Sequence, residues 1–373
     1  MKKIVTVLFF LLTLLLSLKN VQATELDTSF NSYINELSKY SEKSGSEINL
    51  NKIAENLRSG KGIEIDGILG IVLNMLFKEV KSVLVSSVII LIIILISSVV
   101  SAIQISEDSA IIKITTFLCY ILLAIAIIST FITIIELFKN TCEISSNIMQ
   151  IVSPFLLGML IVNGGITSVG IIQPLLLFAS SFSSYLVTSV ITPLIIFSAV
   201  FAVIGNLNEK NTFLRVGAFL RKVSIWVLGI MLTVFLGILS METSISKDVD
   251  SLAVKTTTVA VSNFVPVVGK FFSDSMSSVV GASKIITKVG GYLGIITVIV
   301  TSLSPVIKII SAWLAISLIS LFSEIIGCDK KIYSILSEIA DIYKTISGII
   351  IANSLVFVIA IAIVLNLSSN IVS

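Results

Sequence analysis

Residues 144–208 read ISSNIMQIVSPFLLGMLIVNGGITSVGIIQPLLLFASSFSSYLVTSVITPLIIFSAVFAVIGNLN, without one charged side chain. A helix needs about 20 consecutive apolar residues to cross the hydrocarbon core of a bilayer. The stretch therefore has the length of three crossings, which we place near 148–162, 170–190 and 191–205. A chain that contains such a stretch is predicted to lie in a membrane.

The composition of the whole chain supports this class. Of its 373 residues 55% are hydrophobic and 13% are charged, and the mean hydropathy is +1.09. A soluble globule of this length needs more polar surface. We therefore predict an all-α, polytopic integral membrane protein with about eight or nine transmembrane helices, surrounded by lipid. The net charge of +3 is small and dispersed, so we expect no nucleic-acid partner.

The first 23 residues have the three parts of a secretory signal. Lys2 and Lys3 supply the positive end, residues 4–16 the apolar core and residues 21–23 a small-residue cleavage site. We predict a signal peptide that is cleaved after Ala23. The alternative is an uncleaved signal anchor, and in either case the chain that follows lies outside the cytoplasm.

Residues 24–82 form the predicted exported region, soluble at first and interfacial towards its end. Phe30, Ile34 and Leu37 recur at helical spacing and predict a short amphipathic helix. Roughly 40 residues cannot bury a core alone. This helix must therefore lie on the membrane, dock on the rest of the chain or meet a partner.

The apolar runs divide the remaining chain into two membrane helix groups, residues 83–240 with about six spans and residues 291–373 with about three. Besides the three spans named above, we place spans at 84–103, 114–135, 223–239, 293–310, 311–326 and 346–367. This count puts the basic loop 207–222 in the cytoplasm, as the positive-inside tendency requires for an exported N-terminus. It puts the loop 327–344 on the outer side.

Residues 241–290 interrupt the spans, because charged residues recur too often for a crossing. We predict an outer amphipathic or re-entrant pair of helices, with Pro266 starting or kinking the second helix and Gly269 allowing close approach. Lys270 and Asp274 are spaced to pair on one helix face. Just beyond, Gly290 and Gly294 have the G-x-x-x-G spacing of closely packed membrane helices.

Two features leave alternatives open. The prolines within 144–208 fit either a water-lined path between broken helices or ordinary kinks packed by small residues. Lys308 marks a water-filled cavity or a partner helix, or else extends its ammonium group to the membrane surface. Cys142 and Cys328 fall on one side in this topology, so a disulfide between them is open.

Residues 263–270 read NFVPVVGK, and they are followed by Asp274, by Gly281-Ala282-Ser283 and by the glycine-rich start of a span. This arrangement resembles the signature region of the stage III sporulation protein AE family of endospore-forming Firmicutes. The signal sequence, the short exported region and the later spans are similar to that family's layout. The resemblance therefore covers nearly the whole chain.

The resemblance implies a place in the complex that the mother cell builds in the membrane around the engulfed forespore. The implied partners are other membrane proteins of the same sporulation operon, a secretion-type ATPase, and a forespore membrane partner, stage II sporulation protein Q. Together they would form a channel or feeding conduit that sustains late forespore gene expression. The candidate partner, assembly or conduit residues are Asn263, Phe264, Pro266, Gly269, Lys270, Asp274, Gly290, Gly294 and Lys308.

Three function classes follow from these features. A scaffold or channel subunit is favoured by the signature stretch. A secondary transporter or permease of a small solute is favoured by the proline-broken helices, although buried charge for ion coupling is scarce. An intramembrane enzyme ranks last, because the chain has no histidine and neither an H-E-x-x-H nor a G-x-S-x-G motif. We expect no catalytic residue, cofactor or metal.

Overall fold

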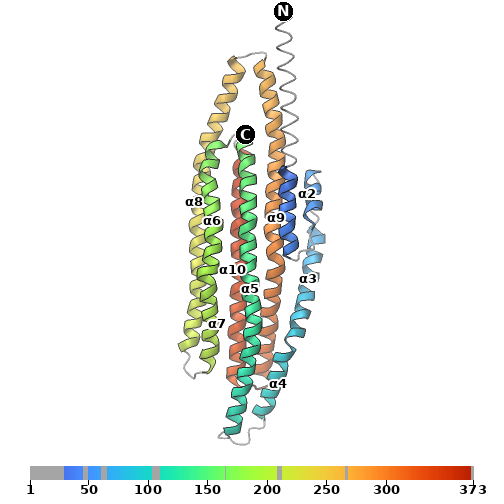
Figure 1. Cartoon of the computed structure of the whole chain (residues 1–373), viewed down its shortest axis with the longest axis vertical. Helices are drawn as coiled ribbons and strands as arrows, with labels where there is room; N and C mark the ends of the chain where they lie inside the picture. The colour runs from blue at the N-terminus through green and yellow to red at the C-terminus, as the bar shows by residue number, and fades with distance from the viewer. Residues whose placement is uncertain are drawn as a thin grey trace, which may run out of the picture.

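The computed structural model describes residues 29–44, 49–59, 65–102, 110–163, 165–207, 212–264 and 268–370. Within these ranges the chain is helical and contains no strand. The helices lie side by side along one axis and form an elongated bundle (Figure 1). The all-α prediction is therefore confirmed, whereas the predicted signal peptide and Pro266 lie outside the described residues.

The helices follow the chain in a simple up-and-down order. After a helix over residues 29–43, the elements are α2 (Leu50–Arg58), α3 (Ile65–Ser86), α4 (Val88–Ala102), α5 (Ala110–Val162), α6 (Ile166–Leu186), η1 (Val187–Ile191), α7 (Thr192–Leu207), α8 (Thr212–Phe264), α9 (Val268–Ile325) and α10 (Lys330–Asn370). Successive long helices run in opposite directions, and the chain ends at the end of the bundle where α5 meets α6 (Figure 1).

Five helical stretches are long and apolar enough to cross a membrane. The bent pair Phe77–Val83 and Val88–Val99, which meet at 48°, makes a sixth if it counts as one span. The predicted count of eight or nine is not confirmed, because three pairs of predicted spans are continuous: α5 joins 114–135 to 148–162, α6 runs through η1 into α7, and α9 joins 293–310 to 311–326. Dividing each apolar run into bilayer-length pieces gives more spans than there are long apolar helices among the described residues.

Prolines do not end these helices. Pro154, Pro174 and Pro305 lie inside α5, α6 and α9. Before Pro193 the chain makes the five-residue π-helical turn η1, and the hydroxyl of Thr192 donates to the carbonyl oxygen of Val187 at 2.8 Å. A π-turn and a hydroxyl donor are the usual ways in which a helix at membrane depth accommodates a proline.

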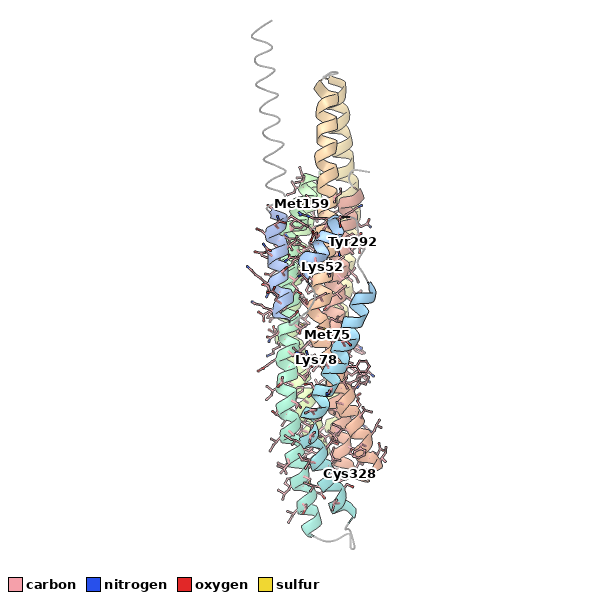
Figure 2. All side chains as sticks on the ribbon, turned by 90° about the vertical axis from the view of Figure 1, so that its right-hand side faces the viewer. Lys52, Met75, Lys78, Met159, Tyr292 and Cys328 are labelled. Atoms are coloured by element: carbon pink, nitrogen blue, oxygen red, sulfur yellow. The ribbon has the colours of Figure 1, made fainter. Side chains whose placement is uncertain are left out.

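Two hydrophobic cores are stacked along the bundle. The core that includes Ile94, Leu123 and Ile335 lies towards the end that carries Cys328. The core that includes Leu156 and Phe357 lies towards the opposite end, where Figure 2 labels Met159 and Tyr292. Large apolar side chains also remain exposed along the outside of the bundle, as expected for a surface that faces lipid.

The segment over residues 241–290 is a helical hairpin. It consists of the last turns of α8 and the first turns of α9, which project together beyond the ends of α5, α6 and α10 (Figure 1). The predicted pair of helices is therefore present, but as extensions of two bundle helices rather than as separate helices lying across the membrane.

The N-terminal helix over residues 29–43 docks on the rest of the chain. Phe30 and Leu37 are 0% and 1% exposed and belong to the same core as Leu156. The aromatic ring of Tyr33 stacks on Phe155 of α5, with ring centroids 4.0 Å apart. Of the three fates that the sequence leaves open for this helix, docking on the chain is the one observed.

Candidate functional site

Three glycines at the start of the bundle part of α9 allow unusually close packing. A methyl group added at Gly290 would overlap the ring of Phe155, and one added at Gly291 would overlap Leu365. At Gly294 it would lie 3.0 Å from Val152 and 3.1 Å from the hydroxyl oxygen of Tyr33. The packing that the G-x-x-x-G spacing predicts is therefore present, against α5, α10 and the docked N-terminal helix.

Tyr33 ties the N-terminal helix over residues 29–43 to this glycine surface. Its hydroxyl donates to the carbonyl oxygen of Gly290 at 2.8 Å, between residues far apart in the sequence. Burial raises the pKa of Tyr33 well above its usual range, because the surroundings disfavour the phenolate. The contact therefore requires the neutral phenol.

The remaining signature residues lie at the far tip of the hairpin. Asn263 and Phe264 are the last residues of α8, while Gly269, Lys270 and Asp274 are in the first two turns of α9. At 1.5 Å per residue, the α9 backbone separates Gly269 from Gly290 by about 30 Å. The predicted site residues thus fall into separate groups, one at the tip and one at the head of the bundle.

Lys308 forms a third group. It lies on α9 with its Nζ atom 3.9 Å from Oε1 of Glu79 on α3, and its side chain is 46% exposed. The lysine therefore has an opposite charge on a neighbouring helix of the same chain. An ion pair this exposed contributes little to stability.

Hydroxyl and amide groups form a polar layer inside the bundle. Ser302 lies 2.7 Å from Ser354 and 3.5 Å from Ser145, which joins three helices through hydroxyl groups. Nearby, Ser183 donates to Asn353 Oδ1 at 2.6 Å. These groups bond one another across helices, as polar residues do when they hold membrane helices together. The layer therefore favours kinks packed by small residues over a water-lined path.

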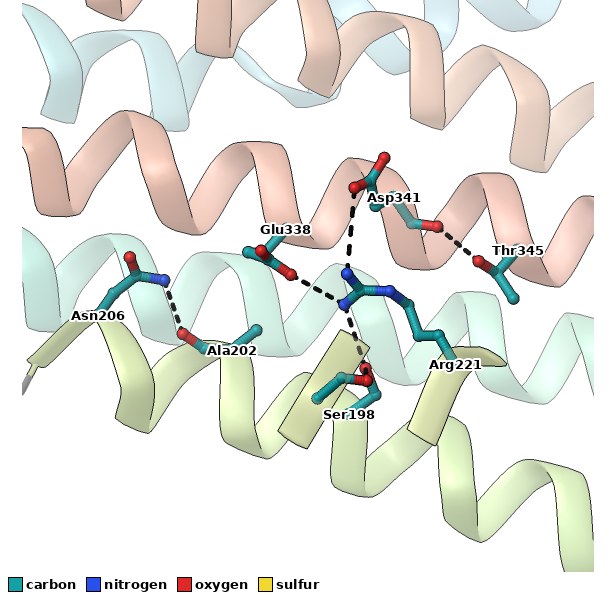
Figure 3. Close-up of polar contacts among 8 residues, drawn as sticks. Ser198, Ala202, Asn206, Arg221, Glu338, Asp341 and Thr345 are labelled. Atoms are coloured by element: carbon teal, nitrogen blue, oxygen red, sulfur yellow. Dashed lines mark hydrogen bonds and ion pairs between the residues drawn. The ribbon is translucent and has the colours of Figure 1, made fainter. Parts of the chain in front are cut away.

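An ionic cluster around the buried Arg221 links α8 to α10, and sequence reasoning missed it. NH1 of Arg221 lies 2.9 Å from Oε2 of Glu338, and NH2 lies 4.0 Å from Oδ2 of Asp341 (Figure 3). NH1 also donates to Ser198 Oγ of α7 at 3.3 Å, while Ser198 donates to the carbonyl oxygen of Gly217. The side chains of Arg221 and Glu338 are only 10% and 22% exposed, whereas that of Asp341 is 60% exposed.

This cluster corrects the predicted topology. The sequence placed Arg221 in a cytoplasmic loop and Glu338 in an outer loop, on opposite faces of the membrane. Two atoms 2.9 Å apart cannot lie across about 30 Å of hydrocarbon. Since α9 is one continuous helix, the start of α8 at Thr212 and residues 326–329 are at the same end of the bundle. The available signal was the i, i+3 spacing of Glu338 and Asp341, which gives α10 an acidic face.

The ionic cluster is suited to joining helices. The guanidinium bridges a carboxylate on α10 and a hydroxyl on α7, so one side chain ties three helices together. Among the described residues no group of three or more Cys, Asp or Glu side chains is placed to hold a metal ion. Cys119, Cys142 and Cys328 are all free thiols in buried positions, so the open disulfide between Cys142 and Cys328 is not formed.

Comparisons with known proteins agree with the resemblance in the sequence. The profile of the family described as Stage III sporulation protein AE (spore_III_AE) matches residues 48–368. The chain is similar to the Stage III sporulation protein AE of Bacillus subtilis (strain 168), with 27% identity over 205 residues that cover 55% of this chain and 51% of that protein. The match thus spans about half the length of this relative. No solved structure matches the chain.

Proposed function

Because this chain belongs to the stage III sporulation protein AE family, we propose that it is a membrane subunit of a channel or secretion-like complex between mother cell and forespore. In this role it supports late forespore gene expression. It acts by holding partner proteins in place, without chemistry of its own. Its place is the mother-cell membrane that surrounds the forespore.

The projecting hairpin is the observation that carries this proposal. The family signature residues Asn263 and Lys270 lie at its tip, beyond the ends of the neighbouring helices (Figure 1). A helical extension that projects beyond the neighbouring helices offers a contact surface for another protein. If the predicted signal exports the N-terminus, the tip faces the space between the two membranes.

The partners we propose are those that the family resemblance implies. They are the other membrane proteins of the same sporulation operon, the secretion-type ATPase and the forespore membrane partner. The hairpin is the proposed contact for proteins between the membranes. The opposite end, with the end of α7 at Leu207, the start of α8 at Thr212 and residues 326–329, is the proposed contact for the ATPase.

Site-specific labelling in intact sporulating cells tests the sidedness of the tip. In a chain whose three cysteines are replaced by alanine, Lys270→Cys should react with an impermeant thiol reagent and cross-link to a protein of the complex. Lys331→Cys, at the other end of the bundle, is the matched control and should react only in permeabilised cells. The reverse pattern would place the tip in the cytoplasm and overturn the proposal.

A charge reversal at the tip tests the role itself. Lys270→Glu should reduce late forespore gene expression while the protein remains in the membrane, because the change alters the contact surface and not the bundle. Normal expression together with loss of solute uptake would instead support the alternative, a secondary transporter. The interhelical hydroxyl contacts of the bundle interior give that alternative no support at present.

A further inference from the structure

A groove of about 650 Å³ runs between α8 and α10 on the outside of the bundle. Its charged groups gather at one end, where three cations and one carboxylate line it: Arg221, Lys222, Lys344 and Asp341. The other end is apolar and is formed by residues such as Leu232 and Ala352. The groove therefore has the polarity of a single lipid molecule, charged at one end and apolar along the rest.

The cations at the polar end are available to a ligand. Arg221 is engaged by Glu338 at 2.9 Å and lies near Asp341. Lys222 and Lys344 are exposed, and neither forms an ion pair with any residue that the structure describes. The two ammonium groups have no carboxylate partner among the described residues, and the guanidinium beside them is neutralised, which favours an anionic head group.

The apolar end has room for an acyl chain. Gly229 and Gly348 line the groove, and a methyl group added at either glycine would meet no atom within 4 Å. Along α10 the groove runs from Asp341 to Ala352, which is about 17 Å at 1.5 Å per residue. That length matches one leaflet, about half of the 30 Å hydrocarbon core.

The two tryptophans of the chain mark the same level. Trp226 is 67% exposed and lies one helical turn beyond Lys222 on α8. The ring of Trp313 on α9 lies 5.9 Å from Nζ of Lys344. Tryptophan is enriched where membrane meets water, so the charged end of the groove is at the head-group level and the apolar end reaches into the hydrocarbon.

We propose that this groove holds one anionic phospholipid, with its phosphate between Lys222 and Lys344 and an acyl chain over Gly229 and Gly348. The lipid belongs to the leaflet at the end of the bundle where α8 begins and residues 326–329 lie. It joins α8 to α10 beside the Arg221 cluster. The proposal is independent of the partner proteins discussed above.

Native mass spectrometry of the purified full-length chain tests the site with two lipids of the same acyl chains, dioleoyl phosphatidylglycerol and dioleoyl phosphatidylcholine. The wild-type chain should retain one phosphatidylglycerol in preference to phosphatidylcholine. Each lysine near a membrane surface contributes about fivefold to anionic lipid binding, so Lys222→Gln/Lys344→Gln should lower the preference about 25-fold. Lys288→Gln/Lys331→Gln, which removes two exposed lysines elsewhere, should leave it unchanged.

A variant that fills the apolar end of the groove tests the contribution of the acyl chain separately from that of the head group. Gly348→Leu should reduce retention of both lipids without loss of the folded bundle, because the new side chain enters open space. The proposal would be overturned if Lys222→Gln/Lys344→Gln kept the wild-type lipid preference, or if the wild-type chain retained the two lipids equally. It would also be overturned if inorganic phosphate displaced the bound phosphatidylglycerol, or if the chain formed a dimer without lipid that Gly348→Leu dissociates. The last of these results would assign the groove to a second copy of the chain.

Discussion

Removing Arg221 alone should destabilise the bundle far more than removing Arg221 and Glu338 together. Their charges are 2.9 Å apart, which corresponds to about 6 kcal/mol of attraction at an effective dielectric constant of about 20. The cost of taking both ions out of water offsets most of that attraction. Breaking a buried pair by removing one partner typically costs about 3 to 5 kcal/mol, because the remaining charge is left uncompensated.

The structure places the expected cost of Arg221→Met near the lower end of that range. Glu338 keeps a side chain that is 22% exposed, so water can reach the orphaned carboxylate in part. We expect a loss of about 3 kcal/mol in Arg221→Met. The double variant Arg221→Met/Glu338→Leu replaces the pair by apolar side chains and should return to within about 1 kcal/mol of the wild-type chain.

A double-mutant cycle on the purified full-length chain in detergent measures this difference. Denaturation midpoints of the wild-type, two single variants and the double variant give the coupling free energy. The pair Lys308 and Glu79 is the matched control, since its atoms are 3.9 Å apart and the lysine is 46% exposed. Its coupling should stay below about 1 kcal/mol. Additive losses at Arg221 and Glu338 would refute the reasoning, because they would mean that the two charges do not depend on each other.

Four further outcomes are expected. Gly290→Ala should lose about 1 to 3 kcal/mol of stability, because the new methyl group overlaps Phe155. The control Gly158→Ala, whose methyl group meets open space, should lose none. Equal melting temperatures of the two variants would contradict the close packing. Tyr33→Phe should make residues 29–58 easier to cleave by protease, because a bond of about 1 kcal/mol to Gly290 is lost, and Tyr40→Phe is the control. Because burial raises the pKa of Tyr33, the docked helix binds the phenolic proton more tightly, so docking should weaken as pH rises above the usual range of tyrosine, and Tyr33→Phe should not follow that change. Burial and the Asp329 carboxylate raise the pKa of Cys328. Alkylation of Cys328 should therefore be slow at neutral pH, become faster as pH rises, and be faster in Asp329→Asn than in the wild-type chain. An alkylation rate equal to that of the cysteine in Lys331→Cys would argue against this environment.

The features that the sequence predicted correctly depend on local patterns. Apolar runs identified helices in the membrane, and the spacing of Phe30, Ile34 and Leu37 identified the amphipathic helix. The spacing of Gly290 and Gly294 predicted close packing because a helix brings residues four apart to one face. Each of these inferences uses only neighbours along one helix.

The features that the sequence did not predict depend on how helices end and which ones meet. Nothing local distinguishes a turn from a helix that continues past Pro305, so predicted spans 293–310 and 311–326 were separated although α9 joins them. The pairing of Arg221 with Glu338 requires knowledge of which helices are adjacent. The same holds for Lys308, whose partner Glu79 comes from a helix more than two hundred residues earlier in the chain.

If α9 is counted as one crossing, the two ends of the bundle lie on opposite sides of the membrane and carry different features. The hairpin, the docked N-terminal helix and the C-terminal end of α10 then belong to the same half of the molecule (Figure 1). If the predicted signal exports the N-terminus, these features face outward. The end of the bundle near Arg215, Lys330 and Lys331 then faces the cytoplasm, in agreement with the positive-inside tendency. The outward half would then contact partner proteins through the hairpin. The basic groove in the inward leaflet would bind lipid and hold the same subunit in place.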